Sequence, residues 1–205
     1  MARPVCEQCL KAKVACICDW ISPVPNQTRI VILQHPDETK KSLGTAKIAF
    51  LSLDNVELLV GVDFSNDLRF NALVSGFKRS AAVLYPSDTA INLNDWQRDS
   101  FLVKTLIVLD GTWRNTREIM LSNKPLQDLV KVKLNPDKHS DYRIRKAPMV
   151  ESLSTVEAIS LSLNILEPAT RVESMLNCFR KMIDHQIACM GEDVYRRNYI
   201  DKSND

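Results

Sequence analysis

Apolar residues are spaced in two ways along the chain from residue 28 onward. Runs that are apolar almost throughout predict buried strands, here at 29–33, 56–62, 81–85 and 105–109. Apolar positions at helical spacing predict helices, here at 38–53, 68–77 and 112–123. Strands that are apolar throughout, rather than alternating, are typical of a sheet covered on both faces. The pattern therefore predicts an α/β domain with a mostly parallel sheet.

The sequence after residue 150 has the pattern of two further helices. The tetrapeptide 154–157, Ser-Thr-Val-Glu, fits a capping box at the start of the first. The second is predicted over 172–190, because Gly191 directly after it is a common helix end. Cys178 and Cys189 fall within this second helix, where free cysteines usually pack as small apolar residues, so we assign them no chemistry.

The other four cysteines lie within the first eighteen residues. They are Cys6, Cys9, Cys16 and Cys18. Four thiolates match the tetrahedral preference of Zn²⁺, and a segment too short to bury a core would take its folding free energy from the metal. An iron–sulfur cluster and four reduced surface thiols are the alternatives, and structural zinc is favoured over both.

Two prolines, Pro23 and Pro25, impose an extended connector after the cysteines. We therefore expect a zinc-binding segment with its connector at 1–27 and an α/β domain at 28–205. With 205 residues, 45% hydrophobic and 25% charged, the chain is long enough for one domain with a small appendage, and wholesale disorder is excluded.

The composition also bears on the compartment. No apolar run approaches the ~18–20 residues that cross a membrane, and the N-terminus lacks the apolar core of a signal peptide. The cysteines are clustered instead of being spread through the chain as in a disulfide-stapled secreted domain. We therefore expect a cytoplasmic protein in a reduced environment, without membrane contact.

Ligands of parallel α/β sheets bind at the carboxyl ends of the strands, which directs attention to the tracts 33–36, 84–87 and 109–113. In the last tract, Asp110 ends the most apolar strand and points into the expected crevice. The alternative is that Asp110 serves only the turn and the helix cap. His35, held extended by the proline after it, is the histidine best placed for a site, with a capping turn as its alternative.

The net charge of +2 conceals a local cluster of basic residues. Between 131 and 146 there are only two acids but six basic residues, namely Lys131, Lys133, Lys138, Arg143, Arg145 and Lys146. Apolar and basic residues alternate over 130–134, which predicts a half-exposed strand with one basic face. Such a face suits a phosphate backbone, and the alternative is a strand edge kept solvated by lysines.

Several common enzyme signatures are absent from the sequence. It contains no glycine-rich phosphate loop, no HExxH motif and no GxSxG motif. With only five glycines in the chain, a glycine-rich phosphate cradle is not available. These absences argue against a Rossmann-type dinucleotide enzyme and against an NTPase.

Four motifs occur in order along the chain. They are Cys6-x-x-Cys9…Cys16-x-Cys18, Gln34-His35-Pro36-x-Glu38, Leu109-Asp110-Gly111-Thr112-Trp113, and Arg143-x-Arg145-Lys146-x-Pro148…Leu153-Ser154-Thr155-x-Glu157-Ala158. Each is weak alone, but their order and spacing resemble the DTW-domain family of tRNA-uridine aminocarboxypropyltransferases. The resemblance implies a SPOUT-like α/β fold with a knotted C-terminal part. It also implies transfer of the 3-amino-3-carboxypropyl group of S-adenosylmethionine to N3 of a variable-loop uridine in tRNA, releasing methylthioadenosine.

The implied reaction suggests roles for particular residues. A carboxylate can take the proton of uridine N3, and Asp110 is the candidate base, with Thr112 and Trp113 shaping the pocket. A helix N-terminus can hold the donor carboxylate. The residues expected at the donor are Gln34, His35, Pro36, Leu84, Tyr85, Pro86, Leu109, Leu153, Ser154 and Thr155. The residues expected at tRNA are Lys11, Lys13, Lys131, Lys133, Arg143, Arg145 and Lys146.

Two other functions fit the same features. One is an RNA methyltransferase of the same fold, which would use the same donor but transfer a different carbon. The other is a noncatalytic zinc-ribbon module that binds RNA, in which Asp110 is only a cap.

Overall fold

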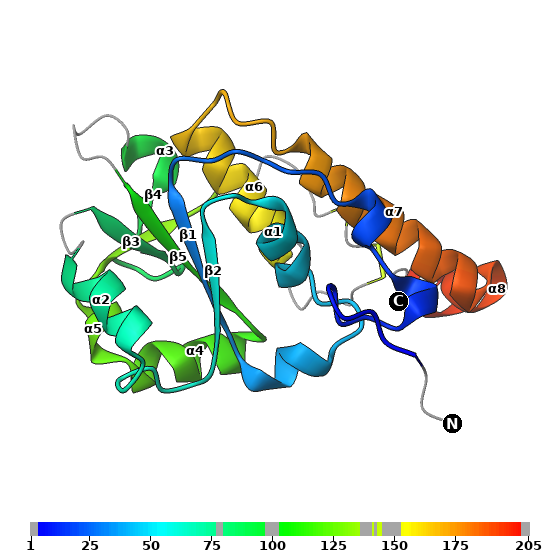
Figure 1. Cartoon of the computed structure of the whole chain (residues 1–205), viewed down its shortest axis with the longest axis horizontal. Coiled ribbons are helices and arrows are strands. Elements are labelled where there is room, and N and C mark those ends of the chain that lie inside the picture. Colours follow the sequence, from blue (N-terminus) through cyan, green and yellow to red (C-terminus); the bar gives the residue numbers. More distant parts are fainter. Residues whose placement is uncertain are drawn as a thin grey trace.

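A six-stranded parallel sheet lies between two layers of helices in the computed structural model of the chain (Figure 1). The structure describes residues 4–76, 80–96, 103–135, 141, 143, 144 and 153–201. The strand order is β2-β1-β5-β3-β6-β4, and every neighbouring pair is parallel. The strands are β1 (Arg29–Gln34), β2 (Val56–Val60), β3 (Ala81–Leu84), β4 (Ile91–Asn92), β5 (Thr105–Asp110) and β6 (Val130–Lys133).

The two faces of the sheet are both apolar, because successive side chains of a strand point to opposite sides. In β1, Ile30 and Ile32 join one buried cluster, while Val31 and Leu33 join the other. Helices α1 (Ala46–Ser52), α6 (Thr155–Leu166) and α7 (Glu173–Met190) cover the first face. Helices α2 (Leu68–Gly76), α4 (Trp113–Ser122) and α5 (Lys124–Gln127) cover the second. The prediction of a sheet covered on both faces is confirmed.

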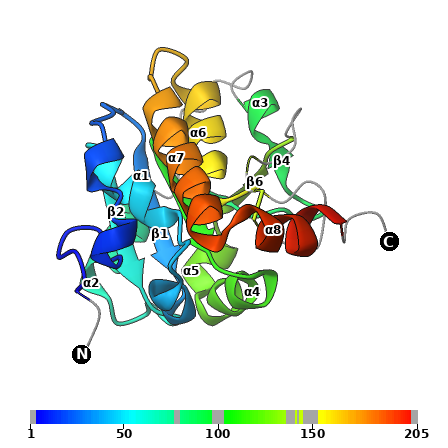
Figure 2. The ribbon, with the colours of Figure 1, turned by 90° about the vertical axis from the view of Figure 1, so that its right-hand side faces the viewer.

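The shorter elements lie at the margins of these layers. They are α3 (Leu93–Trp96), α8 (Glu192–Tyr195), the 3₁₀ turns η1 (Lys13–Ala15), η2 (Cys18–Trp20) and η3 (Pro36–Lys40), and a π turn (Arg196–Ile200). Figure 2 shows α7 outside α6, with the N-terminal segment and its two 3₁₀ turns beside it. No helix in the described ranges is both long enough and apolar enough to cross a membrane.

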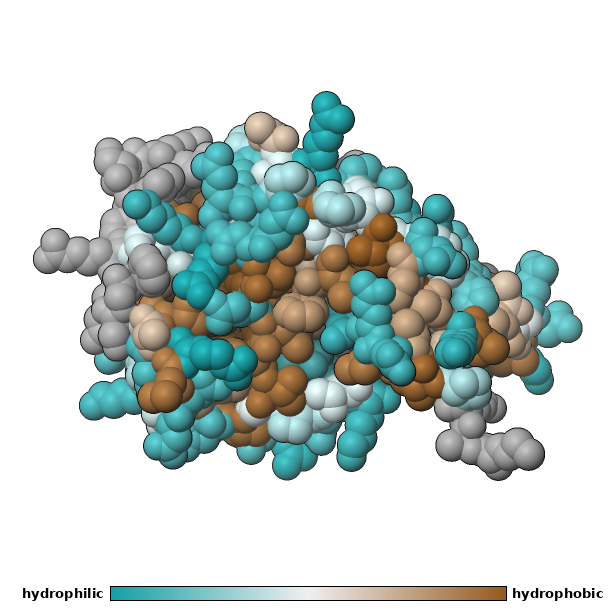
Figure 3. Space-filling model, viewed as in Figure 1, coloured by the Kyte–Doolittle hydropathy of each residue, from teal (hydrophilic) through white to brown (hydrophobic). Residues whose placement is uncertain are grey.

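Strand β2 forms one edge of the sheet. Most of its side chains are only half-buried, and Val60 is 49% exposed. Figure 3, drawn in the view of Figure 1, shows hydrophobic side chains along the middle of the molecule, over β2 and α1, with hydrophilic side chains around them.

The predicted helix over 38–53 is wrong in its first half. The chain forms η3 and then an irregular segment, and α1 begins only at Ala46. Sequence periodicity did not predict this break. In the structure, the carbonyl oxygens of Ser42 and Gly44 accept hydrogen bonds from the side chain of Lys11, about thirty residues earlier. The short β4 and α3 were also not predicted, since two- and four-residue elements carry no periodic signal.

The predicted capping box at the start of α6 is confirmed. The Ser154 hydroxyl accepts from the Glu157 N–H, and the Glu157 carboxylate accepts from the Ser154 N–H at 2.8 Å. The predicted end of α7 is also confirmed, with Gly191 at a φ of 84°. The expected knot stays a prediction, because most of the chain between 136 and 152 lies outside the described residues.

Asn123 provides a test of how α4 is held against the sheet. It is 1% exposed, its Oδ1 accepts from the Phe64 N–H at 2.8 Å, and its Nδ2 donates to the carbonyls of Val62 and Ile119 at 2.7 Å each. Asn123→Ala leaves these buried groups unpaired, so we expect the free energy of unfolding to fall by roughly 2–4 kcal/mol in urea titrations.

Asn94→Ala is the matched control, because Asn94 is exposed. Its unfolding free energy should stay within about 0.5 kcal/mol of the parent. Equal stability of the two variants would show that the buried amide does not hold α4.

Candidate active site and metal centre

A cavity of about 770 Å³ opens at the carboxyl edge of the sheet. It is bounded by the ends of β3, β5 and β6, by the segment after η3 and by the start of α6. Most of the residues predicted at the catalytic centre and the donor line it, namely Leu84, Tyr85, Pro86, Leu109, Asp110, Thr112, Trp113, Leu153, Ser154 and Thr155, and so does Lys133 of the residues predicted at RNA. A volume of this size is typical of sites for small-molecule ligands.

Asp110 lines the cavity and is 6% exposed. In the register of the sheet it stands beside Gln34, whose Nε2 donates to Asp110 Oδ2 at 2.7 Å. The Thr155 hydroxyl, in the first turn of α6, donates to the other carboxylate oxygen. Burial raises the pKa of Asp110, and these two hydrogen bonds lower it by less. The carboxylate thus joins two strands and a helix at the cavity.

The turn after Asp110 is tight for a steric reason. A Cβ at Gly111 would lie 2.9 Å from the Cβ of Asn115, so no side chain fits between β5 and α4. Thr112 caps α4, as its hydroxyl accepts from the Asn115 N–H at 3.3 Å. Trp113 is 46% exposed, lines the cavity and also borders a second, open pocket on α4. Trp113 is therefore not packed in the core.

Gln34 ends β1, and His35 and Pro36 follow it. None of these three residues lines the cavity. Gln34 acts on it through Asp110. His35 is 8% exposed, and its ring lies 3.1 Å from the Asn115 amide, on the α4 side of the sheet. Its Nδ1 accepts from the Asp37 N–H at 3.2 Å, which is the capping alternative weighed for it. Pro36 occupies the first position of η3.

Residues 38–45 form a wall of the cavity that sequence reasoning did not assign to the site. Glu38 is 9% exposed and accepts from the Lys41 ammonium at 2.6 Å. Lys40 also lines the cavity, as does Thr45, whose hydroxyl accepts from the Val156 N–H at 3.4 Å. The sequence signal that could have identified this wall is the pair Lys40 and Lys41, which follows the motif at the end of β1.

The predicted RNA-contacting residues are placed in different surroundings. Lys133 lines the cavity, and Lys13 is exposed on η1. The ammonium of Lys131 donates to the Gln127 carbonyl at 2.9 Å, and Arg143 forms an ion pair with Asp184. Lys138, Arg145 and Lys146 lie outside the described residues.

Lys11, also predicted at RNA, is 8% exposed. Its ammonium donates to the carbonyl oxygens of Ser42 and Gly44, at 2.5 and 3.4 Å. Burial lowers the pKa of Lys11. In this position the ammonium faces the protein interior, so we exclude Lys11 from the residues proposed to contact RNA phosphates.

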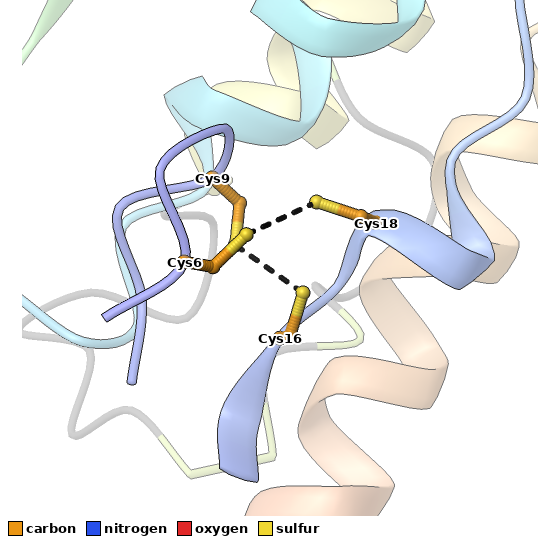
Figure 4. A group of neighbouring side chains, drawn as sticks. All are labelled: Cys6, Cys9, Cys16 and Cys18. Carbon is orange, nitrogen blue, oxygen red and sulfur yellow. Dashed lines mark hydrogen bonds between the residues drawn. The ribbon is translucent and has the colours of Figure 1, made fainter. Parts of the chain in front are cut away.

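The four N-terminal cysteines point toward one another (Figure 4). Their sulfur atoms all lie within 4.8 Å of one another, with 3.7 Å between Cys6 and Cys18 and 3.7 Å between Cys9 and Cys16. A tetrahedral zinc site with Zn–S bonds of about 2.3 Å places its sulfurs about 3.8 Å apart. The four side chains are therefore close enough together to hold a metal ion such as zinc.

The electrostatics of the cysteine cluster also favour a bound cation. Backbone N–H groups, first that of Cys9 and then that of Gln8, lower the pKa of the Cys6 thiol to about 6. Burial raises the pKa of Cys18, with further contributions from the neighbouring thiols. Sulfurs this close cannot all become thiolates unless a bound cation offsets their repulsion.

The cysteine segment packs on the rest of the molecule. Cys9 and Ile17 are buried in the same apolar cluster as α1, α6 and α7. His185 on α7 donates from Nε2 to the carbonyl of Val14 at 2.7 Å, and its ring contacts Trp20 edge-on at 5.9 Å. The metal-binding segment is therefore fixed against the α7 side of the sheet, and the division of domains at residue 27 stays a prediction.

Comparisons with known proteins place this site in a family. The DTW domain matches residues 3–187. Proteins called tRNA-uridine aminocarboxypropyltransferase 2 are 31% identical in Macaca fascicularis, over 85% of this chain and 60% of that one, and 34% identical in Drosophila melanogaster, over 85% and 71%. This chain thus spans about 60% of the macaque relative's length.

A solved structure was compared as well. The SAM-dependent rRNA:acp-transferase Tsr3 from Vulcanisaeta distributa is 16% identical, with a TM-score of 0.46 over 83% of each chain.

Fold and site together define a parallel α/β protein with a buried carboxylate at a ligand-sized cavity and a four-cysteine metal cluster. The chain belongs to the DTW domain family, whose match covers both the cysteines and the cavity.

Metal content tests the cluster directly. Protein purified without chelator should contain one zinc per chain by elemental analysis, because the four sulfurs already have tetrahedral spacing. Cys16→Ser should lower the zinc content several-fold, while Cys189→Ser, outside the cluster, should leave it unchanged. Parent protein without stoichiometric metal, or with iron and sulfide in place of zinc, would contradict the assignment.

The stability of Asp110→Asn should depend on pH relative to the parent. In the parent, the contribution of a group with a raised pKa is fully present below its ordinary value of 3.8 and is lost as the pH rises through the raised pKa. The asparagine stays neutral. We therefore expect the variant's unfolding free energy, relative to the parent, to increase between about pH 4 and pH 7 in urea titrations.

Asp63→Asn is the control of opposite sign. The Ser65 backbone N–H lowers the pKa of Asp63, so this carboxylate adds stability above pH 3.8. The relative stability of Asp63→Asn should therefore fall as the pH rises through the lowered pKa toward 3.8, and stay nearly constant between about pH 4 and pH 7. Parallel slopes in the two variants would mean that burial does not control the ionisation of Asp110.

Proposed function

We propose that this chain is a tRNA-uridine aminocarboxypropyltransferase that uses S-adenosylmethionine as donor. The observation that carries the proposal is the buried carboxylate of Asp110 lining the cavity at the carboxyl edge of the sheet. Membership of the DTW domain family and the relatives called tRNA-uridine aminocarboxypropyltransferase 2 support the same reaction.

The lining of the cavity suits this donor. Leu84, Leu109 and Leu134 supply apolar surface for a nucleoside, and the lysines of the wall supply positive charge for a carboxylate. In the cap of α6 the Ser154 N–H and hydroxyl are already bonded to Glu157. We therefore assign the donor carboxylate to Lys41, whose ammonium keeps two N–H donors besides the one bonded to Glu38, in preference to the start of α6.

Asp110 is the proposed general base. The donor supplies an electrophilic carbon next to its sulfonium, and uridine N3 must lose a proton to attack it. A carboxylate oxygen accepts more than one hydrogen bond, so the bonds from Gln34 and Thr155 orient Asp110 and leave lone pairs for the N3 proton. Its raised pKa makes it a stronger base than an exposed aspartate.

Positive charge around the cavity supports tRNA as the partner. Lys40, Lys41 and Lys133 line the cavity, against Glu38 and Asp110. Each phosphate neutralised by a lysine releases a counterion, so binding should weaken with salt. The exposed Lys13 and the strand residue Lys131 extend this set, whereas Arg143 is already paired with Asp184. Because it acts on tRNA, the proposed enzyme belongs in the cytoplasm. We further propose that 1–27 is its metal-binding segment and 28–205 its catalytic domain.

The assay that tests this function combines the protein with unmodified tRNA and labelled S-adenosylmethionine. The nucleosides are then identified by mass spectrometry. A uridine carrying an aminocarboxypropyl group, with methylthioadenosine as by-product, supports the proposal. A methylated nucleoside would point to a methyltransferase. Absence of donor binding in calorimetry would point to a noncatalytic RNA-binding module.

Asp110→Asn should lower turnover in this assay by roughly 10²–10⁴-fold, because an amide cannot take the N3 proton. The variant should stay folded and still bind donor and tRNA. Raising the pH should partly restore its rate, since uridine then ionises without a base. Lys13→Ala, away from the cavity, should keep its turnover at saturating tRNA. Near-normal turnover of Asp110→Asn would exclude Asp110 as the base.

A further inference from the structure

Lys11 makes hydrogen bonds both within the cysteine cluster and at the wall of the cavity. Its carbonyl oxygen accepts a hydrogen bond from the Cys6 N–H at 2.8 Å. The residue before Lys11 is Leu10, which has a φ of 60°. Its side chain reaches segment 41–45, where the ammonium donates to the carbonyls of Ser42 and Gly44. A single buried residue therefore links two parts of the molecule that are separated by about thirty residues in sequence.

The bonded segment 41–45 is the part of the cavity wall without regular structure. Its residues line the cavity, yet the segment belongs to no helix or strand. The carbonyl oxygens at 42 and 44 are held by a charged donor that is itself shielded from water. Bonds of this kind change a conformational equilibrium by roughly 10–100-fold. The conformation of the wall thus depends on where the Lys11 ammonium is held.

The position of Lys11 depends in turn on the cysteines. Cys9 lies two residues before it, and Cys6 bonds to its carbonyl. The turn between them includes a leucine in the left-handed region, which is costly for a residue with a side chain. Four bonds from thiolates to one metal ion would hold this turn, and with it the backbone of Lys11.

We propose that Lys11 is a positioning residue that couples metal binding at the cysteine cluster to the shape of the cavity wall. The proposal rests on the proposed function only for the identity of the ligand in the cavity. With metal bound, the backbone of Lys11 is fixed and its ammonium holds segment 41–45. Without metal, the segment loosens and ligand binding weakens, although the α/β core stays folded.

Hydrogen exchange tests the coupling without any ligand. The N–H of Lys41 donates to Glu38, and that of Gly44 donates to Lys41, so both amides report on the wall. In zinc-loaded Lys11→Met, which keeps the apolar stem, we expect these two amides to exchange roughly tenfold faster or more. Lys13→Met, on the exposed lysine of the same segment, should match the parent. Amides of β1 and β5 serve as internal standards and should not change.

Metal removal is the second arm. In the parent, a chelator should accelerate exchange at Lys41 and Gly44 by a similar factor, while in Lys11→Met it should add little. Lys11→Arg, which keeps a charged donor, should retain at least part of the protection. Unchanged exchange in Lys11→Met, or an effect of equal size in Lys13→Met, would overturn the proposal. Should Lys11→Met not fold, parent protein that shows no change at these amides on metal removal would overturn it equally.

Calorimetry with S-adenosylmethionine separates this inference from the proposed function. If the parent binds the donor, its Kd should rise roughly tenfold or more in Lys11→Met at full zinc content, and stay unchanged in Lys13→Met. Unchanged donor affinity in Lys11→Met would contradict the coupling. If the parent does not bind the donor at all, the proposed function fails, while the exchange experiment still decides the role of Lys11.

Discussion

The buried carboxylate of Asp110 is the interaction on which the rest of the site depends. It ends β5, accepts from Gln34 at the end of β1, and accepts from Thr155 at the start of α6. A carboxylate loses its hydration on burial, so it stays in this position only where such donors replace water. The same two bonds fix the distance between the sheet edge and α6, and thereby the width of the cavity between them.

The second constraint comes from the N-terminal segment. Four cysteines that could hold a metal ion form a cluster that packs on α7, and Lys11 extends from it to segment 41–45 of the cavity wall. A parallel sheet by itself offers a crevice at its carboxyl edge, but the loops that close the crevice need support. In this chain, one side is supported by the capped start of α6 and the other by a residue of the metal-binding segment.

The sequence predicts best those features of the fold that depend on residues close together in the chain. Runs of buried apolar residues identified the main strands, and the capping box at 154–157 placed the start of α6 correctly, because both signals depend on neighbouring residues. The break at 41–45 was not predicted, and the hydrogen bonds that Lys11 donates to this segment come from outside it. Local patterns likewise could not place His35 on the α4 side of the sheet, because its contact with Asn115 joins two elements.

A crystal structure with S-adenosylmethionine bound would show whether the cavity beside Asp110 holds the donor. We expect the donor inside the cavity, with the carbon to be transferred on the side of Asp110 and its carboxylate toward Lys41. A donor bound outside the cavity, on the open pocket of α4 or elsewhere, would contradict it. So would a donor inside the cavity whose transferable carbon is turned away from Asp110.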